Sequence, residues 1–280
     1  MKKHVIPILL LVILFTYAPF ANAQHSCCST NAFALLTHDK AFVNAHLEPE
    51  YFVLETKLGS DIEFTTPDGK KGHAYEIKAK SPSNKYVFVI HEWWGLNDYI
   101  KQESEKIFNT LGNVNVIAID LYDYQVATSR DSAAKYMQSV KTERAESIVK
   151  GLMNYVGKDA KIATIGWCFG GGWSMQTALI AGKQNVACVM YYGMPEEKME
   201  KLKTINAPVL FVWPDEDKWI NKEMVDRFQK NMLTANKKLE VLTYHADHAF
   251  ANPSNPKHNK EFADDAFTKS MKLMIDAFAK

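Results

Sequence analysis

Short apolar runs alternate along this chain with longer segments of helical periodicity. The run 86–90 is uninterrupted, which is typical of a strand covered on both faces. Asp98 is expected to cap the helix that follows it. Further strands are expected at 114–119, 161–165, 186–192, 209–213 and 239–244, with long helices at 132–155 and 262–278. This alternation predicts an α/β fold: one domain with a mostly parallel central sheet and helices on both faces.

The composition supports a globular chain and limits its partners. Of the 280 residues, 47% are hydrophobic and 12% aromatic, which supplies enough apolar surface for a sizeable core. The formal net charge of +1 predicts no polybasic surface, so neither nucleic acid nor an anionic membrane is an expected partner. The four cysteines are too few for a disulfide scaffold.

The first residues resemble a secretory signal. Lys2 and Lys3 precede an apolar stretch over 5–20, and Ala-Asn-Ala at 21–23 has the form of a cleavage site. A membrane span needs about 20 apolar residues, more than this stretch offers. We therefore expect a signal peptide at 1–23, export to the periplasm or the medium, and no stable membrane insertion once the signal is removed.

The segment 24–50 is weakly patterned and is expected to be an arm of uncertain structure before the domain at 51–280. Three roles stay open for Cys27 and Cys28: a lipid anchor, a disulfide, or a surface tail without catalytic importance. The tail is favoured, because Gln-His-Ser before Cys27 lacks the apolar residue of a lipidation signal. The oligomeric state is not predicted.

The sharpest motif is Gly-Trp-Cys-Phe-Gly-Gly-Gly at 166–172, between an apolar strand and a helical segment. This is the layout of a nucleophile elbow, with Cys168 where serine is more usual. Glycines at 166 and 170 are needed because larger side chains would clash with neighbouring backbone. The helix N-terminus should favour a thiolate at Cys168, and the Phe169 amide can donate to a developing oxyanion.

Candidate acids and bases follow two later strands, at the edge where open parallel sheets build their sites. Asp215, Glu216 and Asp217 follow the strand at 209–213. His245 and His248 follow the strand at 239–244. The order nucleophile, acid, histidine is that of hydrolases with this elbow, in which histidine shuttles the proton and the acid orients it. The residues alone leave the choice within each group open.

A third segment, 91–98, also follows a strand. A turn here would supply a second oxyanion amide, and Glu92 between aromatic residues is in a setting that raises a carboxyl pKa. Taken alone, the segment fits a capping turn with two structural tryptophans better.

Together these motifs resemble the dienelactone hydrolase family over most of the chain after about residue 62. The resemblance rests on His-Glu-Trp-Trp-Gly-Leu-Asn at 91–97, Asp-Leu-Tyr at 120–122, Gly-Trp-Cys-Phe-Gly-Gly at 166–171, Asp-Lys-Trp-Ile at 217–220 and His-Ala-Phe at 248–250. It implies an α/β-hydrolase fold and hydrolysis of an ester or lactone through an acyl-enzyme, without a cofactor.

The resemblance also implies roles for individual residues. The triad would be Cys168, His248 and Asp217. Glu92 would contact the resting thiol, and the amides of Trp93 and Phe169 would form the oxyanion hole. The family context favours Asp217 over Asp215, and His248 over His245.

Two departures from the family bear on the substrate. Tyr124 and Asn252 stand where enzymes acting on the dienelactone carboxylate carry arginines. Without those guanidiniums the carboxylate clamp is lost, so we expect an uncharged or different small ester or lactone. Tyr124, Trp94 and Asn252 are the candidate substrate-binding residues.

Two other hypotheses about the function remain. His245, Asp247 and His248, with His91 and Glu92, would suit a zinc hydrolase, although that would leave the cysteine elbow unexplained. A non-catalytic binding protein with a redox-reactive Cys168 is the other alternative, because a fold alone does not assign chemistry.

Overall fold

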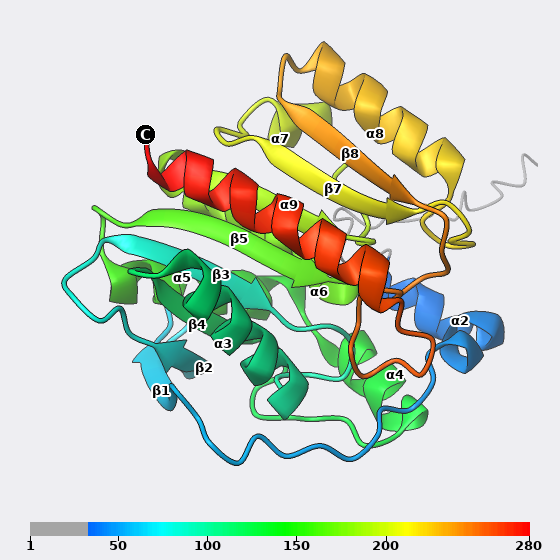
Figure 1. Ribbon diagram of the computed structural model, residues 1–280, viewed down its shortest axis with the longest axis horizontal. Coiled ribbons are helices and arrows are strands. Elements are labelled where there is room, and N and C mark those ends of the chain that lie inside the picture. Colours follow the sequence, from blue (N-terminus) through cyan, green and yellow to red (C-terminus); the bar gives the residue numbers. More distant parts are fainter. Residues whose placement is uncertain (1–32) are drawn as a thin grey trace, which may run out of the picture.

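The computed structural model describes residues 33–280, and an eight-stranded sheet lies at its centre (Figure 1). The strand order is β1-β2-β4-β3-β5-β6-β7-β8. β1 and β2 are antiparallel to their neighbours, and the other strands run parallel to one another. The strands are β1 (Ser60–Thr65), β2 (Lys71–Ile77), β3 (Lys85–Ile90), β4 (Asn115–Asp120), β5 (Lys161–Trp167), β6 (Asn185–Tyr191), β7 (Val209–Pro214) and β8 (Leu239–Tyr244).

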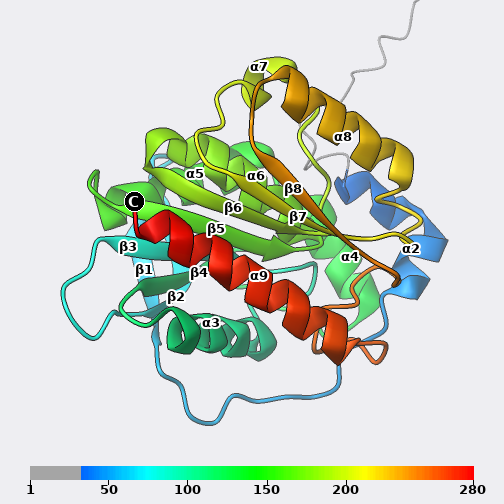
Figure 2. The ribbon, with the colours of Figure 1, turned by 45° about the horizontal axis from the view of Figure 1, so that its top comes forward.

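Helices cover both faces of this sheet (Figure 2). α3 packs on β4, and α9 packs on β6 and β7 on the same side. α6 packs on β5 and β6 on the other side, next to α5. The helices are η1 (Leu36–His38), α2 (Lys40–Ala45), α3 (Asp98–Leu111), α4 (Arg130–Ser139), α5 (Thr142–Val156), α6 (Phe169–Ala181), η2 (Gly182–Gln184), α7 (Met199–Leu202), α8 (Lys222–Thr234) and α9 (Lys260–Phe278). The α/β prediction is confirmed.

The predicted apolar runs form the inner strands of the sheet, where both faces of a strand are buried. All six residues of β4 and of β7 are buried, for example. β1 and β2 were not predicted. β1 lies at the edge of the sheet, and only Phe64 among its residues is buried, so it lacks the apolar run that marks the inner strands.

Two helix predictions were wrong in detail. The stretch 132–155 is two helices, because Val140 and Lys141 have extended backbone between α4 and α5. Asn97 rather than Asp98 caps α3, and its side chain accepts from the Ile100 amide at 3.1 Å. The Asp98 carboxylate instead accepts from the Leu54 amide at 2.9 Å, which ties the chain before β1 to this helix.

The N-terminal part that the structure describes packs at the end of the sheet to which β7 and β8 point (α2, blue in Figure 1). We call residues 33–46 the arm. Phe33 and Phe42 of the arm belong to the same buried cluster as the strands of the sheet. The signal-peptide prediction and Cys27 and Cys28 lie outside the described residues. Within 33–280, no helix combines the length and apolar character that crossing a membrane requires.

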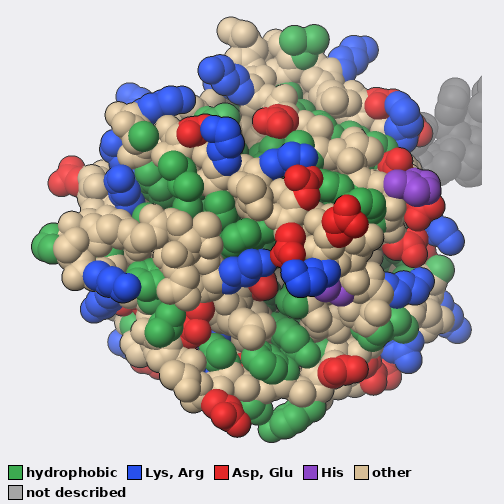
Figure 3. Space-filling view, viewed as in Figure 1, with side chains coloured by type: hydrophobic (Ala, Val, Ile, Leu, Met, Phe, Trp, Pro, Cys, Tyr) green, Lys and Arg blue, Asp and Glu red, His purple; other side chains and the backbone are tan. Residues whose placement is uncertain are grey.

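Charged side chains of both signs are interspersed on the face shown in Figure 3. Many form pairs one helical turn apart, such as Lys260–Asp264 and Lys272–Asp276 on α9. Such exposed pairs contribute at most about 1 kcal/mol each, so the buried core rather than the surface holds the fold together.

Candidate active site

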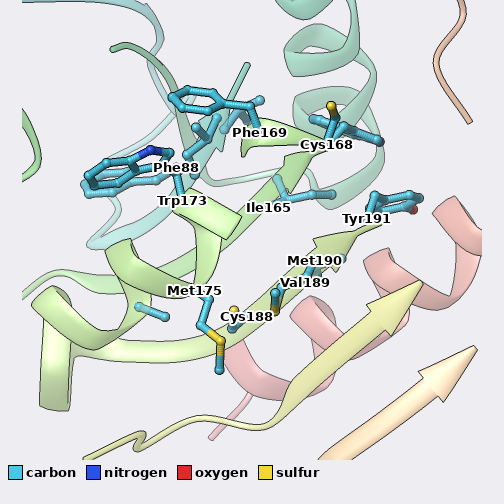
Figure 4. Close-up of a cluster of buried hydrophobic side chains, with 14 of the residues drawn as sticks. Phe88, Ile165, Cys168, Phe169, Trp173, Met175, Cys188, Val189, Met190 and Tyr191 are labelled. Carbon is cyan, nitrogen blue, oxygen red and sulfur yellow. The ribbon is translucent and has the colours of Figure 1, made fainter. Parts of the chain in front are cut away.

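Cys168 occupies a sharp turn between β5 and α6. Its backbone is in a strained region, with φ 56° and ψ −118°. A Cβ at Gly166 would lie 2.1 Å from the Gly170 carbonyl oxygen, and one at Gly170 would lie 2.3 Å from the carbonyl oxygens of Ile90 and His91. The turn therefore requires glycine on both sides of the cysteine. Figure 4 shows Cys168 in the buried cluster, apart from Cys188, which lies beside Met175 and Val189.

The thiol of Cys168 is fully buried. The backbone amides of Phe169 and Trp93 lie beside the sulfur and act to lower the pKa of the thiol. Burial nevertheless raises the pKa of Cys168 well above its ordinary value, and the nearby Glu92 carboxylate raises it further. In this closed form desolvation outweighs the two amides, and the expectation that the helix N-terminus favours a thiolate stays a prediction. The resting group is a neutral thiol.

His248 and Asp217 form a buried pair. The distance from Nδ1 of His248 to Oδ2 of Asp217 is 2.5 Å. The other carboxylate oxygen accepts from the amides of Trp219 and Ile220 at 2.9 and 3.0 Å. Burial opposes ionisation, but His248 and these hydrogen bonds lower the pKa of Asp217 overall. The carboxylate therefore keeps a proton on Nδ1 of His248, and Nε2 carries the lone pair.

The competing acid and base lie together on the surface. His245 is 3.0 Å from Asp215 and 3.3 Å from Glu216, and its side chain is 78% exposed. His245, Asp215 and Glu216 thus contact one another at the surface, separately from the buried Asp217–His248 pair. The geometry thus favours Asp217 and His248 as the pair beside Cys168.

Glu92 is a buried carboxyl group. Burial raises the pKa of Glu92 to about 8, and a hydrogen bond with Asn252 opposes that rise. The Asn252 carbonyl oxygen accepts from the amide and the hydroxyl of Ser254, both at 2.8 Å. Its amide group is thus left to face Glu92. Asn252 is 4% exposed and holds Glu92 in place.

The other two candidate substrate-binding residues make structural contacts. Trp94 is 1% exposed and packs against Trp93 at 4.9 Å between ring centroids. The Tyr124 hydroxyl donates to Glu63 at 2.6 Å, and its ring stacks on His73 at 4.6 Å. These contacts place Tyr124 beside β1 and β2 rather than with Cys168, and roles for both residues in substrate binding stay predictions.

The residues of the zinc-hydrolase alternative are dispersed. The Leu121 amide donates to Nε2 of His91 at 3.1 Å, so Nδ1 carries the proton and donates to the Glu92 carbonyl at 2.6 Å. His91 thus has no free ring nitrogen. His245 is exposed, and Asp247 pairs with Lys257 at 3.4 Å. The structure does not bring this ligand set together.

One residue of the site was missed by sequence reasoning. His46, at the end of α2, places Nε2 3.7 Å from the Cys168 sulfur. Its Nδ1 donates to the Phe42 carbonyl at 2.7 Å. Burial and the neighbouring His248 lower the pKa of His46 to about 3, so the ring is neutral. No motif marks His46, because its position depends on how the arm docks.

The arm covers the thiol. Phe42 packs against Trp219 and Trp93 at 5.2 and 5.9 Å between ring centroids. The Trp219 indole donates to Asp39 at 3.2 Å. A pocket of about 130 Å³ opens beside this cover and has His46, His248 and Trp219 on its wall. With the arm docked, Cys168 has no exposed surface.

The strand order, the strained cysteine turn and the buried acid–histidine pair define an α/β-hydrolase fold. A crystal structure of a putative dienelactone hydrolase from Klebsiella pneumoniae superposes with a TM-score of 0.65 at 21% identity, over 79% of this chain and 99% of that one. The model of the dienelactone hydrolase family matches residues 73–278, and the chain belongs to this family.

Curated relatives extend the likeness over most of their own length. A putative carboxymethylenebutenolidase of Saccharolobus solfataricus is 27% identical over 248 residues, covering 74% of this chain and 94% of the relative. A carboxymethylenebutenolidase of Pseudomonas sp. is 27% identical over 226 residues, covering 74% and 92%.

Proposed function

We propose that this family member is an exported hydrolase of carboxylic ester or lactone bonds with Cys168 as its nucleophile. The observation that carries the proposal is the buried cysteine at a strained elbow, with two backbone amides at its sulfur and the His248–Asp217 pair beside it. The names of the relatives support a lactone or ester as the substrate class.

In the first half of the proposed reaction, the substrate carbonyl oxygen accepts hydrogen bonds from the amides of Trp93 and Phe169, which lie beside the sulfur. The thiol proton passes to Nε2 of His248, and the sulfur attacks the carbonyl carbon. The amides stabilise the oxyanion. The C–O bond of the ester then breaks, and His248 returns its proton to the leaving alkoxide.

In the second half, water replaces the alcohol. His248 takes a proton from the water as its oxygen attacks the thioester carbon. The C–S bond breaks, the acid leaves, and His248 gives its proton to the sulfur, which restores the thiol. Asp217 keeps the imidazole in the required tautomer throughout. Glu92, protonated at neutral pH because its pKa is about 8, adds no negative charge beside the thiolate as that forms.

Substrate can reach Cys168 only when the arm moves. His46 and Phe42 fill the space over the thiol in the closed form. Once the arm is displaced, the opening lies among Trp93, Trp219 and His248, whose rings would contact an uncharged acyl group. With Tyr124 and Asn252 in the arginine positions of the family, we expect simple aryl or alkyl esters to outcompete a dienelactone carboxylate.

The test is hydrolysis of a short-chain p-nitrophenyl ester by the protein and its Cys168→Ala variant. Activity in the first and none in the second supports the cysteine mechanism. Equal activity in both would overturn it. Iodoacetamide labelling of Cys168 without any activity to lose, over a panel of esters and lactones, would indicate a binding protein instead.

Export is a separate part of the proposal. It rests on Lys2 and Lys3, the apolar stretch and the Ala-Asn-Ala site at 21–23. N-terminal sequencing of protein recovered from the periplasm or medium should begin at Gln24. Recovery only inside the cell, with Met1 or Lys2 first, would contradict export.

A further inference from the structure

We propose that His46, Cys168 and His248 form a binding site for a borderline-soft divalent metal ion such as Zn²⁺, which locks the arm over the thiol. The three potential ligand atoms lie within 4.8 Å of one another, and all three residues are buried. His46 comes from the arm, Cys168 from the elbow and His248 from the loop after β8, so one ion would join three separate segments of the chain.

The spacing of the ligand atoms is close to that of a tetrahedral site. Zinc binds sulfur at about 2.3 Å and nitrogen at about 2.0 Å, which puts the two ligands about 3.5 Å apart. The observed distance from His46 Nε2 to Cys168 Sγ is 3.7 Å. With every ligand atom inside 4.8 Å of the others, no pair has to approach by more than about 1.3 Å to reach that spacing.

Both imidazoles are oriented as metal ligands are. Nδ1 of His248 bonds to the Asp217 carboxylate, and Nδ1 of His46 bonds to the Phe42 carbonyl. Each of these partners holds Nδ1 and leaves Nε2 directed away from the hydrogen bond, which is the usual outer arrangement around a zinc-bound histidine. Nε2 of His248 is buried and has no hydrogen-bond partner among the described residues.

The donor set selects the class of ion. One thiolate and two imidazoles suit zinc and its neighbours in the first transition row better than magnesium or calcium, which prefer oxygen. Three protein ligands leave a fourth position for water. The pocket of about 130 Å³ has His46 and His248 on its wall, so it reaches two of the three proposed ligands.

Binding would convert the proposed nucleophile into a ligand. The S–H bond breaks, the proton goes to solvent and a Zn–S bond forms, while each imidazole binds through Nε2 and keeps its Nδ1 hydrogen bond. Because His46 is held as well, the same ion would keep the arm closed. Inhibition of hydrolysis by the bound ion rests on the proposed function, whereas binding of the ion at this site does not.

The direct test is titration of the reduced, metal-free protein with Co²⁺, followed by displacement with Zn²⁺. A 1:1 complex with a sulfur-to-cobalt charge-transfer band is expected in the near ultraviolet, together with the visible bands of a tetrahedral ion. These signals do not depend on any activity, so a protein that hydrolyses nothing still tests the site. Absence of the charge-transfer band at saturating Co²⁺ would overturn the proposal.

Variants at Cys168 and His46 test two of the three ligands. Cys168→Ser should abolish the charge-transfer band. His46→Phe keeps an aromatic ring among Phe42 and Trp93, and should weaken binding at least about 100-fold, since even outer partners of a metal cost 10- to 100-fold. His46→Gln is the second choice if that variant does not fold, as judged by circular dichroism.

The matched control is His245→Gln, which removes an exposed histidine paired with Asp215 and Glu216. It should bind Co²⁺ as the unaltered protein does. Wild-type affinity in both His46 variants would refute the role of the arm in the site. Equal weakening by His245→Gln would show adventitious surface binding and would also refute the proposal.

Discussion

Replacing Phe42 with alanine should open the arm and expose Cys168. Phe42 is fully buried, and its ring lies 5.2 Å from Trp219 and 5.9 Å from Trp93 between centroids. Truncating a buried phenylalanine costs about 3–5 kcal/mol. Since the ring contacts the body of the protein from the arm, this loss falls on docking of the arm. Each 1.4 kcal/mol is about a tenfold change, so the open population should rise at least about 100-fold.

The assay is iodoacetamide labelling of native protein, read out by peptide mass spectrometry. The labelling rate of Cys168 should rise at least about 100-fold in Phe42→Ala. Cys188 is an internal control, because it is buried against Ser174 in the core and is not covered by the arm. Leu35→Ala is the matched variant, since Leu35 is on the same arm but 59% exposed, and should change nothing.

Two results would refute this reasoning. An unchanged rate at Cys168 would mean that Phe42 does not hold the cover over the thiol. Equal acceleration at Cys168 and Cys188 would mean that the substitution unfolds the whole domain rather than releasing the arm.

Three further predictions follow from the site. Asp217→Asn should lower kcat/KM about 10³- to 10⁴-fold with an unchanged circular dichroism spectrum, because the amide no longer fixes the tautomer of His248; an effect below tenfold would contradict the role of Asp217. The pKa of Glu92 is raised from 4.5 to about 8, so the folded state binds a proton that the unfolded state has lost. Stability should therefore fall as pH rises from about 4.5 to 8 and then level off, and Glu92→Gln should flatten that fall in a series of urea unfolding curves; parallel curves for both proteins would contradict it. Gly166→Ala puts a methyl group 2.1 Å from the Gly170 carbonyl and should lower the thermal midpoint sharply, whereas an unchanged midpoint would show that the elbow relaxes.

Sequence reasoning found the parts of the fold that local patterns of apolar residues determine. The inner strands are continuous apolar runs because helices cover both of their faces. The edge strand β1 was missed because most of its residues are exposed and only one side chain, Phe64, is buried, so it has no apolar run. Asn97 and Asp98 are both good caps by residue type, and in the structure Asn97 caps α3 while Asp98 accepts from the distant Leu54 amide, a contact that no local pattern predicts.

The candidate site divides in the same way. The strained turn at Cys168 needs glycines at fixed spacing, so it leaves a readable motif. The choice of Asp217 over Asp215 could be made from family context but not from charge or position alone. His46 left no trace, because its place beside the sulfur depends on packing between Phe42 and residues about 50 and 180 positions away, Trp93 and Trp219.

The central claim is that Cys168 forms a covalent acyl intermediate. The most direct measurement is acid quenching of the protein during turnover of p-nitrophenyl acetate, followed by peptide mass spectrometry. The account predicts an acetyl group on Cys168 that disappears as substrate is exhausted. Steady hydrolysis with no acyl group on Cys168 at any time would contradict it.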